Sequence, residues 1–460
     1  MKQVDFAHGR TLSNILATAV PMLAAQILNL LYNIVDRIYI ARIPGVGTAA
    51  LGAVGLCFPV ILLITAFTNL YGSGGAPLFA IARGQGDEEE AKRIQDTSFF
   101  LLLLTGAVLT VLGELIGRPT LRAFGASENA LTYALPYLRI YLLGTLFSMI
   151  ATGMNPFINA QGFSTIGMLT VTIGAVANFL LDPLFIFVLH MGVQGAAVAT
   201  VLSQALSAAF SLSFLLGKRS SYPVKLLRWK QLSLARVRRI TGLDFAGFIM
   251  QFTNTLVSIS CNRVLGHFGG DLYISIMTIV SSARQMIETP IHSLAEGSSP
   301  VISYNYGARK PWKVREATAI MFLIATGYSL LVWGFIRLFP EKVISIFSSD
   351  KTILEDTIPA FHLYFSAFLC MVFQYTGQNV FKSLGLKYQA IFFSLFRKVA
   401  IVVPLTYLLP YTFHMGTNGV FLAEPISNAV GGLACFITML IQVLPMLKKM
   451  EKDGEKGSVD

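Results

Sequence analysis

The sequence predicts an all-α polytopic membrane protein with twelve transmembrane helices in two repeats of six. Composition is the first observation behind this prediction, because 54% of the 460 residues are hydrophobic and only 13% are charged. The hydrophobic residues form long blocks instead of amphipathic stripes, which is typical of a chain that crosses a membrane many times. The other two observations are the lengths of these blocks and an internal repeat.

Runs of about 20 mainly apolar residues are long enough to cross the hydrocarbon core of a bilayer. The sequence predicts such spans near residues 12–40, 49–82, 97–117, 130–159, 165–189, 193–216, 239–265, 272–305, 316–338, 355–383, 388–409 and 417–446. Most basic residues fall in alternate loops and near the two ends of the chain. The positive-inside rule therefore places both termini in the cytoplasm.

The basic loops also explain the net charge of +11. Because the basic residues lie in short segments between spans, they indicate lipid headgroups and topology rather than nucleic acid. The four cysteines all fall within apolar runs and show neither a disulfide framework nor metal-binding spacing. We find no nucleotide-binding loop, so the sequence gives no support for ATP as a direct energy source.

A long polar linker between spans six and seven divides the chain into two similar halves. We expect an N-terminal six-helix lobe at 1–217, a basic cytoplasmic linker at 218–237, a C-terminal six-helix lobe at 238–447 and a disordered cytoplasmic tail at 448–460. Pro77 with Gly84 matches Pro300 with Gly307 at an offset of 223 residues, Gly162 matches Gly385 at the same offset, and His190-Met191-Gly192 matches His414-Met415-Gly416 at 224. Repeats of six spans enter the membrane in the same sense, as in a parallel duplication.

Two acids, Asp36 and Asp182, lie inside apolar segments of the first repeat. A carboxylate at membrane depth costs about 2.5–3.5 kcal/mol, so another interaction must compensate. Asn178 shares a helical face with Asp182, and Thr200 offers a hydroxyl in the sixth span. Together the four side chains supply oxygen ligands for Na⁺, or a carboxyl pair that shares a proton. Hydrogen-bonded helix packing is the alternative for each of them.

These acids are not duplicated in the second repeat. At offsets of 223 to 225, Asp36 falls near Ser260 or Cys261, and Asp182 near Leu405 or Thr406. The second repeat instead has its own charges, Arg397 and Lys398 in span eleven and Glu424 in span twelve, for which we favour a structural ion pair over substrate binding. Arg284 and Glu288 are four residues apart in span eight and can pair along the helix. Alternatively, Glu288 or Glu424 can face a cavity and attract cationic substrates.

Twelve spans in two halves, Pro21 before Asp36, and the set Asn178, Asp182 and Thr200 resemble the multidrug and toxic compound extrusion (MATE) family, in particular its DinF/MepA-like branch. The resemblance implies that Asp36, Asn178, Asp182 and Thr200 form the cation-coupling site and that Pro21 is where the first span bends. The chain departs from the NorM-like branch, which has an acid in span seven. Gln251 and Asn254 stand in that stretch here and are candidate cavity or substrate residues, together with Arg284 and Glu288.

The resemblance implies a secondary active multidrug exporter, not an enzyme, that exchanges lipophilic cations for H⁺ or Na⁺ by alternating access of two lobes. We expect no cofactor, a monomer among membrane lipids, and a bacterial or archaeal cell membrane. One alternative is a flippase for a lipid-linked saccharide or cell-wall precursor. Another is an intramembrane aspartyl protease, although neither NIVDRIY around Asp36 nor FLLDPLF around Asp182 has a GxGD setting.

Overall fold

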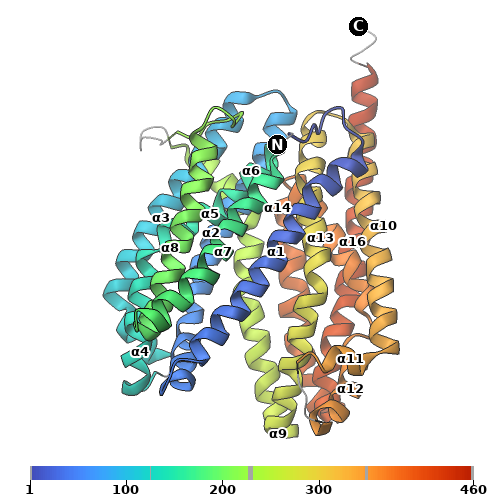
Figure 1. Ribbon diagram of the computed structural model, residues 1–460. Coiled ribbons are helices and arrows are strands. Elements are labelled where there is room, and N and C mark those ends of the chain that lie inside the picture. Colours follow the sequence, from blue (N-terminus) through green and yellow to red (C-terminus); the bar gives the residue numbers. More distant parts are fainter. Residues whose placement is uncertain (1–2, 125, 226–231, 348–350, 457–460) are drawn as a thin grey trace. The chain divides into compact units, whose positions relative to one another are not determined.

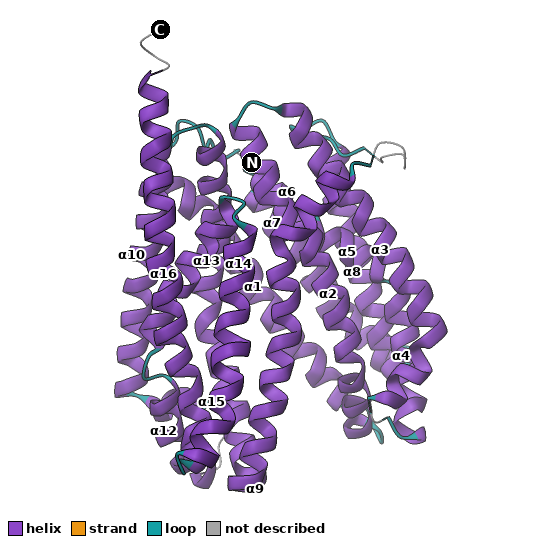
Figure 2. Ribbon diagram, turned by 180° about the vertical axis from the view of Figure 1, so that it is seen from behind, coloured by secondary structure: helices purple, strands orange, loops and turns teal. Residues whose placement is uncertain are grey.

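The computed structural model describes residues 3–124, 126–225, 232–347 and 351–456, and every regular element among them is a helix (Figures 1 and 2). The first half of the chain contains α1 (Thr11–Ala41), α2 (Gly47–Gly84), α3 (Glu88–Ala123), α4 (Glu128–Leu143), α5 (Thr145–Gly153), α6 (Asn155–Ala160), α7 (Ser164–Pro183), the π-helix η1 (Leu184–Val188) and α8 (Gly192–Leu216). The second half contains α9 (Leu234–Gly307), α10 (Pro311–Leu338), α11 (Pro340–Ile344), α12 (Lys351–Tyr364), the 3₁₀ helix η3 (Phe368–Cys370), α13 (Met371–Ser383), α14 (Lys387–Leu395), the π-helix η4 (Phe396–Val402), α15 (Val403–Tyr407), the π-helix η5 (Leu408–Thr412) and α16 (Gly416–Lys456).

The helices have the lengths that a multi-pass membrane protein requires. Within the described residues, eight are long and apolar enough to span a membrane, and counting each of two bent helix pairs as one span gives ten. The bent pairs turn by 54° between α4 and α5–α6 and by 45° between α12 and α13. In addition, α9 merges two helices across Gly270, whose φ of 65° is not helical. To within one residue, each predicted span lies within one of these helices or bent pairs, and two of the predicted spans lie within α9.

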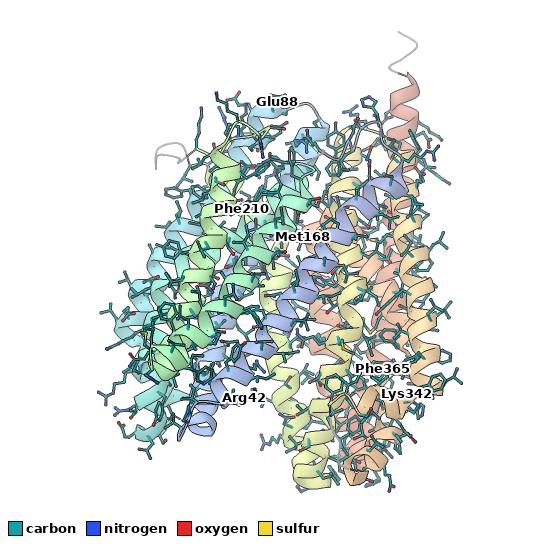
Figure 3. All side chains as sticks on the ribbon, in the orientation of Figure 1. Arg42, Glu88, Met168, Phe210, Lys342 and Phe365 are labelled. Carbon is teal, nitrogen blue, oxygen red and sulfur yellow. The ribbon has the colours of Figure 1, made fainter. Side chains whose placement is uncertain are left out.

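Polar side chains cap the N-termini of α3 and α4. The Asp87 side chain accepts a hydrogen bond from the backbone N–H of Glu90 at 2.9 Å, and Ser127 does the same for Ala130 at 3.2 Å. Such caps satisfy backbone donors that the first turn of a helix leaves without partners. In Figure 3, Glu88, the first residue of α3, is labelled near the top of the view, and Arg42, which follows α1, is labelled near the bottom.

The chain divides into two compact units. Unit 1 comprises Met1–Asp5 and Val20–Asp244, and unit 2 comprises Phe6–Ala19 and Phe245–Asp460. Compared with the expected lobes, unit 2 also includes the first part of α1, and unit 1 also includes the first turns of α9. The division of α1 falls at Ala19 and Val20, immediately before Pro21, although α1 is a continuous helix through the proline.

Hydrogen bonds explain why Phe6–Ala19 belongs to unit 2. The Thr18 hydroxyl donates to the carbonyl of Gly297 at 2.5 Å, and the Asn305 side-chain amide donates to the carbonyl of Phe6 at 3.2 Å. The ammonium group of Lys313 donates to the carbonyl of Ala7 at 2.8 Å. The last two donors satisfy carbonyls at the start of the chain, and all three bonds hold this segment on α9 and α10.

Left-handed backbone positions reveal the duplication directly. Every residue with a positive φ among the described residues has a counterpart 223 to 225 positions away: Gly45 with Gly270, Gly86 with Arg309, Gly162 with Gly385, His190 with His414, and Gly192 with Gly416. Each position ends or redirects a helix, where a glycine has no steric cost. The two halves therefore turn at equivalent places, which supports the predicted repeat.

Small residues allow close contacts inside each unit. In unit 1, a Cβ atom built on Gly72 would lie 2.5 Å from the carbonyl oxygen of Gly153, so α2 and α5 touch through their backbones. In unit 2, a Cβ atom on Gly377 would lie 2.8 Å from the Cys435 sulfur, which brings α13 against α16. Contacts of this kind are typical of membrane helices, because packing replaces the hydrophobic drive that water provides elsewhere.

The C-terminal tail differs from the expectation. The sequence predicts disorder from residue 448, but α16 continues as a helix to Lys456, and 457–460 lie outside the described residues. Lysine and glutamate are good helix formers, so a helix already nucleated in the preceding span extends into this stretch. Arg315 on α10 also pairs with Glu451 and holds the extension against unit 2.

Substituting Gly297 with alanine should destabilise the protein, because the new Cβ atom would lie 2.5 Å from the Cα atom of Ala19. We expect a cost of about 1–3 kcal/mol from overpacking, seen as a lower unfolding temperature in detergent. Gly327→Ala is the matched control, since nothing lies within 4 Å of its Cβ position. An alanine in that open helical position should maintain or raise the unfolding temperature. Equal effects of the two changes would contradict the close contact at Gly297.

Candidate ion and charge sites

Two helices of unit 1 bring Asp36 and Asp182 together. Asp36 lies in the last third of α1, and Asp182 lies in the last turn of α7, directly before Pro183 and the π-helix η1. The rings of Tyr39 on α1 and Phe179 on α7 are 6.2 Å apart and help to pack the two helices. Single π-helical turns inside longer helices often occur at functional sites, because they redirect side chains without ending the helix.

The four predicted residues of the first repeat form one connected group. The carboxyl groups of Asp36 and Asp182 lie close enough to interact with each other. The Asn178 amide nitrogen donates to Asp182 Oδ1 at 3.2 Å and to Thr200 Oγ1 at 3.5 Å. Asn178, Asp182 and Thr200 are buried, and Asp36 is half-buried. We name these four residues the acid pair site.

Two oxygen atoms of the acid pair site have no hydrogen-bond donor. They are Asp36 Oδ1 and Asp182 Oδ2, both fully shielded from solvent. A buried carboxylate oxygen without a donor is costly, so these atoms fit a positive ligand. No group of three or more His, Cys, Asp or Glu side chains in the described residues has a metal-binding arrangement.

Three tyrosines near the acid pair site were not predicted. Tyr32, Tyr137 and Tyr141 all lie close enough to Asp36 to interact electrostatically with its carboxyl group. Tyr137 and Tyr141 stack on each other along α4, with ring centroids 6.3 Å apart. A signal did exist for Tyr32, which precedes Asp36 by four residues and shares its helical face. The tyrosines of α4 have no such signal, because only the fold brings that helix to α1.

The five charged candidate residues of the second repeat form a single cluster in unit 2. Glu424 Oε1 accepts hydrogen bonds from Arg397 at 2.9 Å and Lys398 at 3.1 Å, and it forms an ion pair with Arg284 Nη1 at 2.6 Å. Arg284 also pairs with Glu288, whose other oxygen accepts from the Tyr375 hydroxyl at 3.1 Å. We name Arg284, Glu288, Arg397, Lys398 and Glu424 the buried charge cluster. The sequence predicts two separate ion pairs, and the structure joins them through Arg284.

A local irregularity lets two consecutive bases reach the same acid. Arg397 and Lys398 both lie in the π-helix η4, which is wider than an α-helix and rotates less from one residue to the next. Room for Arg397 comes from Gly431 on α16, where a Cβ atom would lie 3.1 Å from Arg397 Cγ. Nothing in the apolar pattern of 388–409 signals this π-helix.

The positions in unit 2 that correspond to the acid pair are neutral. Cys261 and Thr406 stand 225 and 224 residues after Asp36 and Asp182, and their side chains lie 4.0 Å apart. Glu424 is 224 residues after Thr200. Corresponding residues therefore lie near each other in both repeats, but the charged positions differ. The first repeat has its charges at Asp36 and Asp182, and the second has a charge at Glu424, the position that corresponds to Thr200.

The remaining candidates from the sequence are not drawn into either site. Asn254 on α9 is exposed, and within the described part of the chain it makes no hydrogen bond or ion pair with the buried charge cluster. The side chain of Gln251 lies outside the described structure. Their proposed part in a cavity or substrate site stays a prediction.

Comparison with known proteins gives consistent matches over almost the whole chain. A family model described as MatE matches residues 21–184 and 247–408. The "FAD transporter" of Shewanella oneidensis is 24% identical over 443 residues, covering 93% of both chains, and "Multidrug export protein MepA" of Staphylococcus aureus strain N315 is 22% identical over 431 residues, covering 92% of both.

Solved structures show the same fold. A "Crystal structure of MATE in the bent conformation" matches with a TM-score of 0.91 and 26% identity, covering 98% of this chain and 99% of the other. The "Outward-facing conformation of a multidrug resistance MATE family transporter of the MOP superfamily" matches with a TM-score of 0.89 and 26% identity, covering 97% of this chain and 99% of the other.

Replacing Glu424 with glutamine should strongly destabilise unit 2. The change leaves three buried bases with only Glu288 to balance them, and removing one partner of a buried ion pair costs about 3–5 kcal/mol. We expect much less folded protein by size-exclusion chromatography and a lower unfolding temperature. Glu128→Gln is the control, because Glu128 pairs with Arg122 on the exposed surface, where solvent screening leaves such pairs with little effect on stability. Near-equal stability of the two variants would contradict the central position of Glu424.

Proposed function

Because the chain belongs to the MATE family of transporters, we propose that it is a secondary active exporter that exchanges lipophilic organic cations for protons at the acid pair site. Members of this family are transporters and not enzymes, so the aspartyl protease alternative does not apply to Asp36 and Asp182. The names of the relatives, multidrug export protein and FAD transporter, support the movement of organic molecules. We expect a monomer in the cell membrane of a bacterium or archaeon.

One observation carries this proposal: two neighbouring carboxyl groups interact, and each has a solvent-shielded oxygen that lacks a donor. Two carboxyl groups can hydrogen-bond to each other only when one of them carries a proton. The same pair without that proton has two like charges in a poorly polarisable environment, which is costly. The acid pair therefore has two states of very different energy, separated by the binding of one cation.

Asn178 and Thr200 position the pair. The Asn178 amide fixes Asp182 Oδ1 by donating to it, which leaves Oδ2 for the coupling ion. In the proposed cycle, protonation of the pair favours the conformation that releases substrate, and loss of the proton favours the conformation that accepts it. Coupling requires the ion and the substrate to bind the two conformations unequally. Exchanging one proton for one monovalent cation moves no net charge, so each tenfold concentration ratio supplies about 1.4 kcal/mol.

Asp36→Asn should abolish export while leaving the protein folded. The amide keeps the size of the side chain and cannot change its charge, so the pair loses its two-state character. Export is measured as ethidium efflux from proteoliposomes, and folding as the elution profile and unfolding temperature. Asp87→Asn is the matched control, because Asp87 is an exposed helix cap that asparagine replaces well. Full ethidium export by the Asp36 variant would remove Asp36 from the coupling role.

An imposed pH gradient should drive ethidium transport in wild-type proteoliposomes, and an imposed Na⁺ gradient at constant pH should not. The expectation follows from the contact between the two carboxyl groups, which suits a shared proton better than a larger ion. Transport driven only by Na⁺ would assign Na⁺ to the oxygen atoms of Asp36, Asn178, Asp182 and Thr200 instead. Absence of ethidium transport under both gradients, from folded protein, would favour the lipid-precursor flippase, which a screen of lipid-linked saccharides would then test.

A further inference from the structure

The buried charge cluster contains more positive than negative charge. Its three bases, Arg284, Arg397 and Lys398, face two acids, Glu288 and Glu424, in the contacts of the described residues. Arginine stays protonated in proteins, and a charge without a partner inside a membrane protein is costly. Two of the bases can be matched, Arg284 with Glu288 and Lys398 with Glu424. Arg397 is then left sharing an acid that is already neutralised.

Arg397 retains unused binding capacity. Its side-chain hydrogen bonds within the described residues, to Glu424 Oε1 at 2.9 Å and Asn428 Oδ1 at 2.7 Å, both use Nη1. A guanidinium has five N–H donors in a planar fork, which matches the two oxygens of a carboxylate or phosphate. The side chains of Arg397 and Arg284 are 12% and 14% exposed, so the cluster is not completely sealed.

A purely structural cluster would not need the third base. The π-helix η4 and the glycine at position 431 are local features that bring Arg397 to an acid already paired with Lys398. Without Arg397 the cluster would have two bases, two acids and no net charge. Its presence therefore adds one uncompensated positive charge to a buried site, at a cost in stability that a bound anion would offset.

We propose that the buried charge cluster binds an anionic oxygen group, a phosphate or a carboxylate, with Arg397 as its principal contact. This inference rests on the proposed transport function in one respect: it extends the substrates from simple lipophilic cations to organic compounds that also carry an anionic group. An anionic lipid such as phosphatidylglycerol presents the same phosphate chemistry as a soluble compound, whereas the phosphate of phosphatidylcholine is balanced by the cationic choline of its own headgroup. An experiment must therefore separate the two sources.

The test compares riboflavin with riboflavin 5′-phosphate, which have the same ring system and differ by one phosphate. Equilibrium binding to purified full-length protein is measured by fluorescence quenching, in nanodiscs of phosphatidylcholine and in nanodiscs that also contain phosphatidylglycerol. In phosphatidylcholine we expect the phosphate form to bind about tenfold or more tightly than riboflavin, the range of a charge-assisted hydrogen-bonded pair. A preference maintained in both membranes supports a soluble substrate, and one lost with phosphatidylglycerol supports occupation of the site by lipid.

Arg397→Gln should remove the preference for the phosphate form without lowering the unfolding temperature, because the remaining charges of the cluster balance. A merely structural role for Arg397 predicts the opposite, a lower unfolding temperature. Arg118→Gln, on the exposed surface of unit 1, is the control and should retain the preference. Equal binding of the two flavins to wild type, or an unchanged preference in folded Arg397→Gln, would overturn the proposal.

This binding experiment uses no ion gradient. Its failure therefore leaves the ethidium assay of the acid pair unaffected, and failure of ethidium export leaves the binding result unaffected.

Discussion

The free-energy cost of charge inside a membrane governs what each unit can hold. Every carboxylate, guanidinium or ammonium group at that depth must be matched, protonated or hydrogen-bonded. Unit 1 contains an acid pair whose spare oxygens have no donor. Unit 2 contains an acid surrounded by bases that belong to the chain itself. In our proposal, an exchangeable cation meets this constraint in the first repeat, whereas the arginine and lysine side chains of the chain meet it in the second.

The duplication makes this contrast informative. Both repeats turn at corresponding left-handed positions, and corresponding side chains still meet, as Cys261 meets Thr406 where Asp36 meets Asp182. The backbone architecture has therefore been preserved while the chemistry at its centre has diverged. A site that can gain and lose a cation suits energy coupling. A site with permanent excess positive charge suits recognition of an anion, and a division of these tasks between repeats follows from our two proposals.

Much of the fold could be predicted from the sequence, because apolar runs of membrane length have few alternatives. The predicted spans lie within the observed helices, although only eight to ten of these are long and apolar enough to cross a membrane in the described residues. The offsets of the glycine and His-Met-Gly motifs reappear as paired turns. The grouping of Asn178, Asp182 and Thr200 could also be predicted, from helical spacing and family resemblance. The tyrosines of α4 and the link through Arg284 could not, since they depend on which helices become neighbours. The π-helix at Arg397 could not be predicted either, because the pattern of apolar residues there does not distinguish a π-helix from an α-helix.

The division of α1 between the two units has a consequence for the order of events in biogenesis. Thr18 hydrogen-bonds to Gly297, which follows it by 279 residues, and Lys313 holds Ala7 across 306. The ribosome therefore makes the start of α1 long before its partners exist, while the rest of α1 can pack as soon as unit 1 is complete. Contacts between residues so distant in sequence form late, because a long loop must close first. Two halves divided in the linker and produced as separate chains would each lack part of their own fold. Unit 2 includes Phe6–Ala19 from the beginning of the chain, and unit 1 includes the first turns of α9.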